Sequence, residues 1–131
     1  MKQSSFRFSD PFLKDISFSI NEDFSPPADG VSIEIETEVE VHPSKEDGRS
    51  ALVNIHISLG RGAESAPFTL SMTMAAVFRW EEPFSKEAVD KLLSKNAPAL
   101  LIGYARPIIA MVTNASPFPA YNLPFINLKD G

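Results

Sequence analysis

Two histidines and a neighbouring glutamate are the side chains of this sequence best suited to metal or acid–base chemistry. His42 and His56 lie in segments where apolar and polar residues alternate. Both occupy polar positions, so we expect them to face solvent. With Glu40 they offer two imidazoles and a carboxylate, but their spacing matches no zinc motif and no cysteine assists. The sequence therefore predicts no metal site.

Further glutamates recur at every second position before Glu40, at Glu34, Glu36 and Glu38. Acid–base catalysis needs a carboxylate in a desolvated pocket, whereas alternate residues of a strand share one face. This pattern indicates a solvated face. Gly-rich phosphate loops and the Gly-x-Ser-x-Gly motif are absent, and Gly60-Arg61-Gly62 is typical of a turn between strands. We expect no catalytic residues, no cofactor and no enzymatic activity.

The composition of this 131-residue chain limits its partners and its compartment. Twelve Lys and Arg against 17 Asp and Glu give a net charge of −5. Nucleic acids and anionic membranes are disfavoured, because binding them requires basic side chains against phosphates. The absence of cysteine fits a reducing cytoplasm, and residues 1–10 lack the apolar core of a secretory signal. We expect a single cytoplasmic domain over residues 1–131.

Four segments alternate apolar and polar side chains, as half-buried strands do: residues 12–20, 31–41, 51–59 and 67–80. Short polar connections separate them, and Asp47-Gly48 has the chemistry of a hairpin turn. These features predict an antiparallel meander.

The period changes after the fourth segment. Ser85 is a candidate N-cap for a helix to about residue 95, with Phe84 and Val89 at the spacing of a hydrophobic staple. A second helix is expected over about 105–114, with Tyr104 as its cap. The expected fold class is α+β, a four-stranded antiparallel sheet followed by two helices packed on one face.

The stretch 96–128 is strongly apolar, with Arg106 as its one charged side chain. Prolines and a glycine interrupt it, so it does not read as a membrane span of about 20 apolar residues. The second helix is apolar on opposite sides and should be buried all round. One sheet can cover only one side of this helix, so we expect a second copy of the chain to cover the opposite side. The alternative is a monomer with the tail folded over the helix. The predicted interface consists of Tyr104, Ala105, Ile108, Ile109, Met111 and Val112.

Several segments together resemble the SecB family of bacterial holdase chaperones. They are LKDISF at 13–18, the three alternating strands that follow, AAVF at 75–78, Tyr104-Ala105-Arg106 and FPAYNLPFINL at 118–128. The last segment resembles the family's crossover segment. The matching residues there are Phe118, Pro119, Leu123, Pro124 and Asn127.

The resemblance implies the SecB fold, assembled as a dimer or a dimer of dimers. It also implies that the chain holds unfolded or nascent polypeptides without ATP, in connection with protein export. Clients would bind an apolar groove near the crossover segment, where an aromatic surface can bind many peptide sequences without specificity for any one of them. The implied groove residues are Trp80, Tyr104, Phe118, Tyr121, Leu123, Phe125 and Ile126.

The face that would dock the export motor departs from the family pattern. Asp15 keeps one acidic position, but Ser19, Thr69 and Ser71 stand where further acidic and apolar docking residues are expected, and the sequence ends at Gly131 without the family's extended tail. One alternative is therefore a non-catalytic SecB-fold interaction protein of a different pathway that binds one defined partner, such as an antitoxin. A second is a small ligand-binding protein or enzyme on another helix-on-sheet fold.

Overall fold

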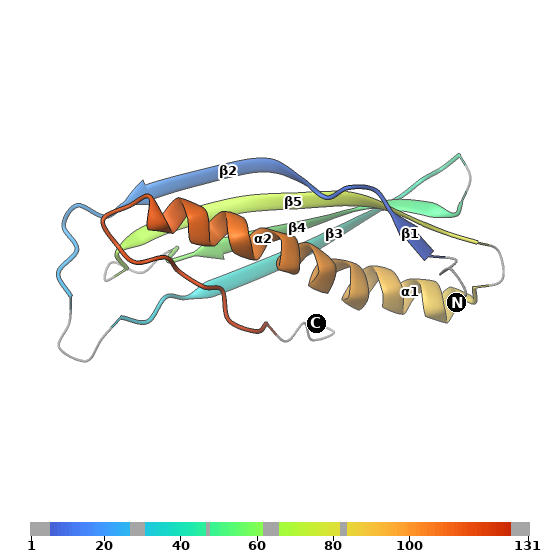
Figure 1. Cartoon of the computed structure of the whole chain (residues 1–131). Helices are drawn as coiled ribbons and strands as arrows, with labels where there is room; N and C mark the ends of the chain where they lie inside the picture. The colour runs from blue at the N-terminus through green and yellow to red at the C-terminus, as the bar shows by residue number, and fades with distance from the viewer. Residues whose placement is uncertain (1–5, 27–30, 47, 62–65, 82–83, 127–131) are drawn as a thin grey trace, which may run out of the picture.

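A computed structural model describes residues 6–26, 31–46, 48–61, 66–81 and 84–126. Its main feature is an antiparallel sheet with a long helical segment lying along one face (Figure 1). The elements are β1 (Phe6–Phe8), β2 (Phe12–Ile20), β3 (Ile35–Pro43), β4 (Ser50–Leu59), β5 (Phe68–Trp80), α1 (Lys86–Lys91), the π-helical turn η1 (Leu92–Asn96) and α2 (Ala97–Asn114).

The strands are arranged around β5. On one side β5 pairs with β4, which in turn pairs with the edge strand β3; on the other side it pairs with both β1 and β2. The predicted α+β class and antiparallel sheet are confirmed. The prediction of four strands is wrong by one, because three residues of β1 are too few to show a period. At 13 residues β5 is longer than the 9 residues of β2, and its last residues pair with β1.

The strands begin and end where the neighbouring strand offers residues to pair with. The predicted strand 12–20 coincides with β2, whereas β3 begins at Ile35 rather than at residue 31. Ile35 pairs with Leu59, the last residue of β4, and the chain turns at Gly60 with φ +72°. A Cβ at Gly60 would lie 2.2 Å from the carbonyl oxygen of Phe68, so the turn needs glycine there.

Only one face of the sheet is covered by helix. Alternate residues of β5 from Phe68 to Phe78, all apolar, lie on this face, and so do their partners on β4, for example Ile57 opposite Met72. The intervening residues, such as Ser58 opposite Ser71, form the outer face. On β2, Ile16 and its apolar neighbours point to the helical side, but they lie at the sheet edge and stay partly exposed.

The helical segment is continuous, so the prediction of two separate helices is wrong. The predicted N-cap is confirmed, since the Ser85 hydroxyl accepts the N–H of Ala88 at 3.1 Å. The predicted break between about residues 95 and 105 is helical: η1 leads directly into α2, which starts at Ala97 with Pro98 in its first turn. Proline has no N–H to donate, and just before it the N–H of Ala97 bonds the carbonyl oxygen of Leu92 in the π-helical pattern. Tyr104 consequently lies inside α2 and is not a cap.

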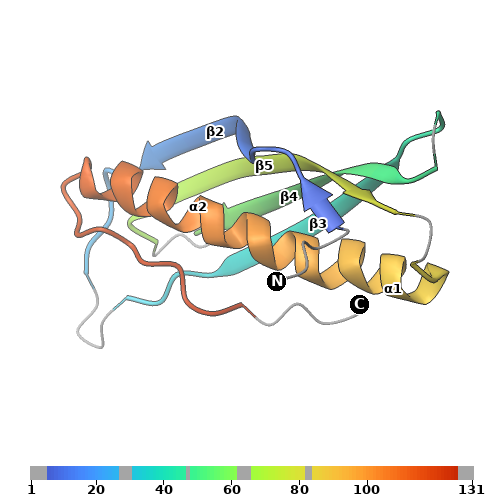
Figure 2. The same ribbon diagram turned by 45° about the vertical axis from the view of Figure 1, so that its right-hand side comes forward.

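The helix α2 covers β4 and β5 with its buried face, which includes Leu101, Ala105 and Ile109. The chain then turns and runs back alongside α2 as an extended segment, which we call the crossover segment (residues 115–126; Figure 2). Leu123 of this segment is buried in the core. Within the described residues, no helix combines the length and apolarity needed to cross a membrane.

Candidate functional site

An apolar pocket of about 260 Å³ lies at the end of the sheet where β5 begins. Three separate parts of the chain form it: the connection between β2 and β3, the start of β5 and the crossover segment. The described residues that line it carry no charge. They are Phe24, Val31, Ile33, Pro67, Phe68, Phe118, Pro119, Ala120 and Tyr121.

Aromatic rings make the floor and one rim of the pocket. Phe68 is buried at the floor, and its ring centroid lies 6.4 Å from that of Phe118 and 6.3 Å from that of Tyr121. Phe24 meets Phe118 edge-on across the rim, at 5.8 Å. Burial raises the pKa of the Tyr121 hydroxyl above its ordinary value of 10.0, so this residue is uncharged at neutral pH. The pocket therefore presents aromatic surface without a formal charge.

A buried threonine at the end of α2 positions the aromatic rim. The Thr113 hydroxyl donates to the carbonyl oxygen of Ile109 at 2.8 Å and accepts the backbone N–H of Tyr121 at 2.7 Å. Ser116 donates its hydroxyl to the Thr113 carbonyl oxygen and accepts the N–H of Phe118 at 3.1 Å. These bonds fix an otherwise irregular segment, so Phe118 and Tyr121 are held over the pocket.

Further along, Arg106 and Leu123 fasten the crossover segment to the rest of the chain. Arg106 donates from its guanidinium to the carbonyl oxygen of Pro124 at 3.2 Å, and Leu123 packs into the core. Beyond this point Phe125 is 87% exposed and Ile126 is half-buried. The segment thus leaves a large aromatic side chain in solvent just after its anchored part.

The structure brings together two of the residues expected in a groove and separates the others. Phe118 and Tyr121 line the pocket, whereas Tyr104 lies on the exposed surface of α2. Trp80 lies at the far end of β5, where its ring stacks on Phe6 at a centroid distance of 6.4 Å. Because β5 spans 13 residues, Trp80 and the pocket are about 40 Å apart at roughly 3.3 Å per residue.

The predicted groove did not include seven of the residues that line the pocket: Phe24, Val31, Ile33, Pro67, Phe68, Pro119 and Ala120. Phe68 was visible as part of the apolar face of its strand. Phe24 lies in a connection without any period, so nothing in the sequence indicated that it would meet Phe118. Only the fold places the two side by side.

The comparisons with known proteins agree with this architecture. The family model described as SecB, preprotein translocase subunit SecB, matches residues 1–130. This chain belongs to the SecB family. No curated protein matches it in sequence.

Two solved structures share the SecB fold with this chain. One is the Mycobacterium tuberculosis Rv1957 SecB-like chaperone in complex with a ChAD peptide from the Rv1956 HigA1 antitoxin. It is 17% identical with a TM-score of 0.73, over 92% of this chain and 90% of that one. The other is a protein of unknown function from Streptococcus agalactiae, 15% identical with a TM-score of 0.51, over 92% of this chain and 97% of that one. At these identities the likeness shows the fold.

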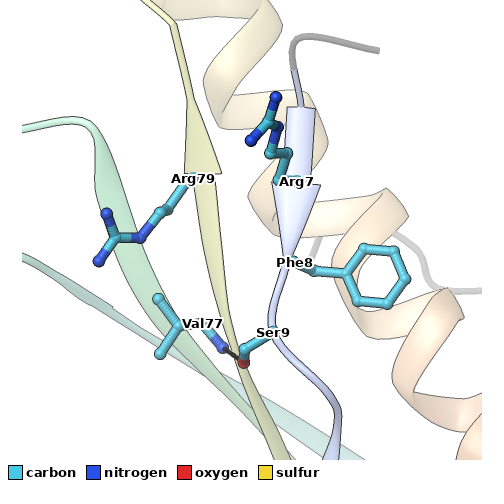
Figure 3. A pocket seen from close by; sticks show the side chains of 5 residues that line it. All are labelled: Arg7, Phe8, Ser9, Val77 and Arg79. Atoms are coloured by element: carbon cyan, nitrogen blue, oxygen red, sulfur yellow. Dashed lines mark hydrogen bonds between the residues drawn. The ribbon is translucent and has the colours of Figure 1, made fainter. Parts of the chain in front are cut away.

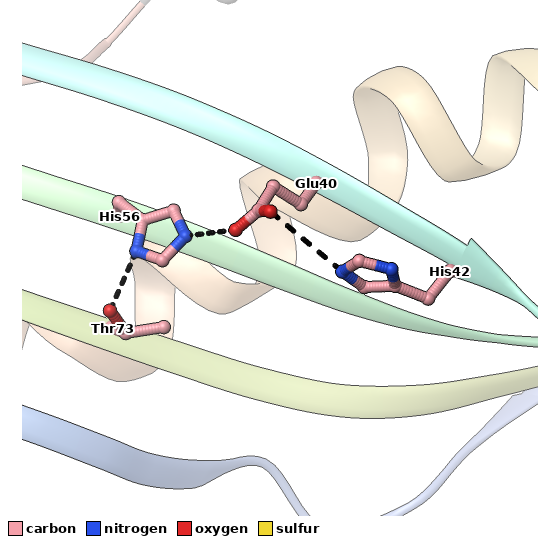
Figure 4. Close-up of polar contacts among 4 residues, drawn as sticks. All are labelled: Glu40, His42, His56 and Thr73. Atoms are coloured by element: carbon pink, nitrogen blue, oxygen red, sulfur yellow. Dashed lines mark hydrogen bonds and ion pairs between the residues drawn. The ribbon is translucent and has the colours of Figure 1, made fainter.

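The outer face of this SecB-family chain carries the histidines. His56 lies between Glu40 and Thr73: its Nε2 bonds the Glu40 carboxylate, and its Nδ1 is 2.7 Å from the Thr73 hydroxyl (Figure 4). His42 approaches the other carboxylate oxygen at 3.9 Å. The hydrogen bond from His56 lowers the pKa of Glu40 below its ordinary value of 4.5.

These polar groups form a hydrogen-bonded network on an open surface. Glu40 and His42 are exposed, and the residues of the network are not among those that line the apolar pocket. Within the described part of the chain, His, Asp and Glu side chains form no cluster able to hold a metal ion. The network cross-links β3, β4 and β5 on the outer face.

Proposed function

We propose that this chain is an ATP-independent holdase chaperone, which binds unfolded or nascent polypeptides through the apolar pocket. Membership of the SecB family supports a chaperone role without catalysis. The observation that carries the proposal is the open aromatic pocket formed by Phe24, Phe68, Phe118 and Tyr121. Such a surface gains affinity by burying apolar side chains and asks for no particular sequence. Extended client segments expose those side chains.

Client contacts would extend from the pocket along the crossover segment. Phe125 and Ile126 lie further along this segment, and Tyr104 projects from α2. Leu123 is buried, so its role in this proposal is to anchor the segment rather than to touch a client. We leave Trp80 out of the groove because it packs at the opposite end of β5.

We also propose that the chain assembles as a dimer or a dimer of dimers. Met111 is 70% exposed and Tyr104 45% exposed on α2, with Ile108 and Val112 half-buried beside them. The edge strand β2 adds partly exposed apolar side chains on the same side of the sheet. They are Leu13, Ile16 and Ile20. Ala105 and Ile109 are buried within the chain, so they are not part of this interface.

Assembly is tested by the mass in solution. Met111→Asp together with Ile16→Asp should shift the mass toward that of one copy, because charges are costly in an apolar interface. Ala88→Asp, on an exposed position of α1, is the matched control and should leave the mass unchanged. A wild-type chain that sediments as a monomer at all concentrations would contradict the proposed assembly.

Two cellular roles in the cytoplasm are compatible with this activity. One is protein export; Asp15 of β2 lies on the outer face opposite Thr73 and would be part of the docking face. Ser17, Ser19 and Ser71 surround it with uncharged side chains, so we expect weak docking to an export motor. The alternative is a pathway with one defined partner, as for the SecB-like chaperone from Mycobacterium tuberculosis, which holds a peptide of an antitoxin.

The chaperone proposal is tested with a chemically unfolded client diluted into buffer without nucleotide. The wild-type chain should slow the aggregation of the client, and Phe118→Ala should weaken client binding by about tenfold, as expected for one lost aromatic anchor. Phe125→Ala should weaken binding less, because its ring is a proposed client contact outside the pocket, and Ala88→Ser on α1 is the control without a proposed contact. Unchanged aggregation together with no binding to the unfolded client would rule the proposal out. A single folded protein retained by both Phe118→Ala and Phe125→Ala would favour the alternative role.

A further inference from the structure

Two arginines on the outer face of the sheet flank one hollow. Within the described residues, neither arginine forms an ion pair with a carboxylate. Arg7 of β1 lies directly opposite Arg79 of β5 in the antiparallel register, and both side chains are exposed. Like charges directly opposite one another on paired strands are destabilising. Among the described residues, the ion pairs are those of Glu40 with the two histidines, so neither arginine has an acidic partner there.

The hollow forms because the edge of the sheet is interrupted after β1. The N–H of Ser9 donates to the carbonyl oxygen of Val77 at 2.9 Å, and the N–H of Val77 donates to the Ser9 hydroxyl oxygen at 3.0 Å. The chain then departs from β5. The resulting hollow of about 370 Å³ is lined by Arg7, Phe8, Ser9, Val77 and Arg79 (Figure 3). The Ser9 hydroxyl accepts one bond and keeps its own hydrogen to donate.

The two guanidinium groups extend in different directions from their neighbouring strands (Figure 3). A second hollow of about 200 Å³ shares both arginines and is also lined by Trp80 and Glu81. One compact anion does not suit two cations arranged in this way. Two carboxylates spaced along a chain do, since alternate residues of an extended segment lie on one side, about 7 Å apart.

We propose that this hollow docks an acidic peptide segment of a partner polypeptide in an extended conformation. Guanidinium groups match carboxylates in shape and in hydrogen bonding. Val77 adds a small apolar surface beside the two arginines, whereas the ring of Phe8 points to the helical side of the sheet, where it packs against Phe78 (Figure 3). The site is about 30 Å from the apolar pocket, since roughly nine residues of β5 at about 3.3 Å each separate them. It is therefore a second site and does not depend on the pocket.

The test uses a fluorescein-labelled peptide that alternates glutamate and leucine, with a glutamine-for-glutamate peptide as its neutral counterpart. The intact chain should bind the glutamate peptide more tightly than the neutral one. Arg7→Gln and Arg79→Gln should each weaken binding about fivefold, and together about 25-fold, as expected for two exposed ion pairs. Arg61→Gln, at an exposed turn residue elsewhere, is the matched control and should have no effect.

Stability supplies a second readout. Removing one of two opposed like charges should leave the urea midpoint of unfolding unchanged or raised. Lost peptide binding with a lowered midpoint in both single variants would mean that the arginines serve the fold, and the proposal would be wrong. Equal affinity for the two peptides also overturns it. Displacement of the peptide by equimolar inorganic phosphate would indicate a phosphate site and would also overturn the proposal. A change of the mass in solution on Arg79→Gln would indicate a contact with a second copy and would overturn it too.

Discussion

Two aromatic clusters lie at opposite ends of β5, and they differ in what holds them. The first, which we call the pocket cluster, comprises Phe18, Phe24, Phe68, Phe118 and Tyr121. The second, which we call the edge cluster, comprises Phe6, Phe8, Phe78, Trp80 and Phe84. Both contain the same kinds of side chain. The first lines the apolar pocket, whereas Phe8 and Trp80 of the second border the hollows beside Arg7 and Arg79.

The difference lies in the backbone that carries the rings. In the edge cluster, Phe6 and Phe8 sit directly opposite Trp80 and Phe78 on paired strands. Cross-strand spacing fixes neighbouring rings at packing distance. In the pocket cluster, Phe24 and Phe118 come from connections whose path is set by a few hydrogen bonds, so the rings meet at the rim and leave space beneath. Regular pairing closes an aromatic cluster, and irregular connections can leave it open for a guest.

The largest expected effect is on the free energy of unfolding, and it comes from a substitution in the edge cluster. Phe78 is buried in the edge cluster, so Phe78→Ala should lower the free energy of unfolding by about 3–5 kcal/mol. Urea unfolding measures this loss. Client affinity per folded molecule should not change, because Phe78 is far from the pocket. Phe8→Ala, at an exposed ring of the same cluster, should cost less than about 1 kcal/mol. A loss of client affinity in folded Phe78→Ala would erase the distinction between the clusters.

The next effect tests what positions the pocket rim. Thr113→Val keeps the shape of the buried side chain but leaves the N–H of Tyr121 without its acceptor. The free energy of unfolding should fall by about 1–3 kcal/mol, and client affinity should fall too because the rim loses its fixed geometry. Thr113→Ser retains the hydroxyl and is the control. If Thr113→Val binds clients normally, the rim is not positioned by this bond.

Filling the pocket should separate binding from stability. Ala120 lines the pocket and is half-buried, so Ala120→Phe should place a ring in the open space. We expect about a tenfold loss of client affinity with a change in stability below about 0.5 kcal/mol, as for a surface substitution. Fluorescence titration with an unfolded client measures the affinity, and Ala88→Phe on α1 is the control. Full client affinity in Ala120→Phe would place the client elsewhere.

The smallest effect concerns pH. The pKa of Glu40 is lowered in the folded state, so its pairing with His56 contributes stability above the ordinary value of 4.5, and this contribution is lost as the pH falls through the lowered pKa. Urea midpoints of the wild type and Glu40→Gln should therefore converge between about pH 5 and pH 3. Glu36→Gln is the control on the same strand. An uncharged peptide should bind the pocket equally over this range, since its described lining lacks a carboxylate.

The sequence by itself determined the sheet, the helix start and the family. Alternation between residues 12 and 80 marks the strands because side chains on a strand point to opposite faces, and Ser85 marks the helix start because its hydroxyl satisfies a free N–H. These signals are local, so they survive without knowledge of the fold. The helix over residues 96–104 was not predicted, because Pro98 and Gly103 disfavour helix locally, whereas in the fold α2 packs against β4 and β5.

Only the tertiary structure decided which aromatic residues share a site. Trp80 and Phe118 look equivalent in sequence, yet the length of β5 separates them and the path of two connections brings Phe24 to Phe118. The pairing of Arg7 with Arg79 likewise depends on a three-residue strand without a detectable period. Contacts between residues distant in the chain follow from strand register and from the route of loops. The spacing of residues within one segment determines neither the strand register nor the route of the loops.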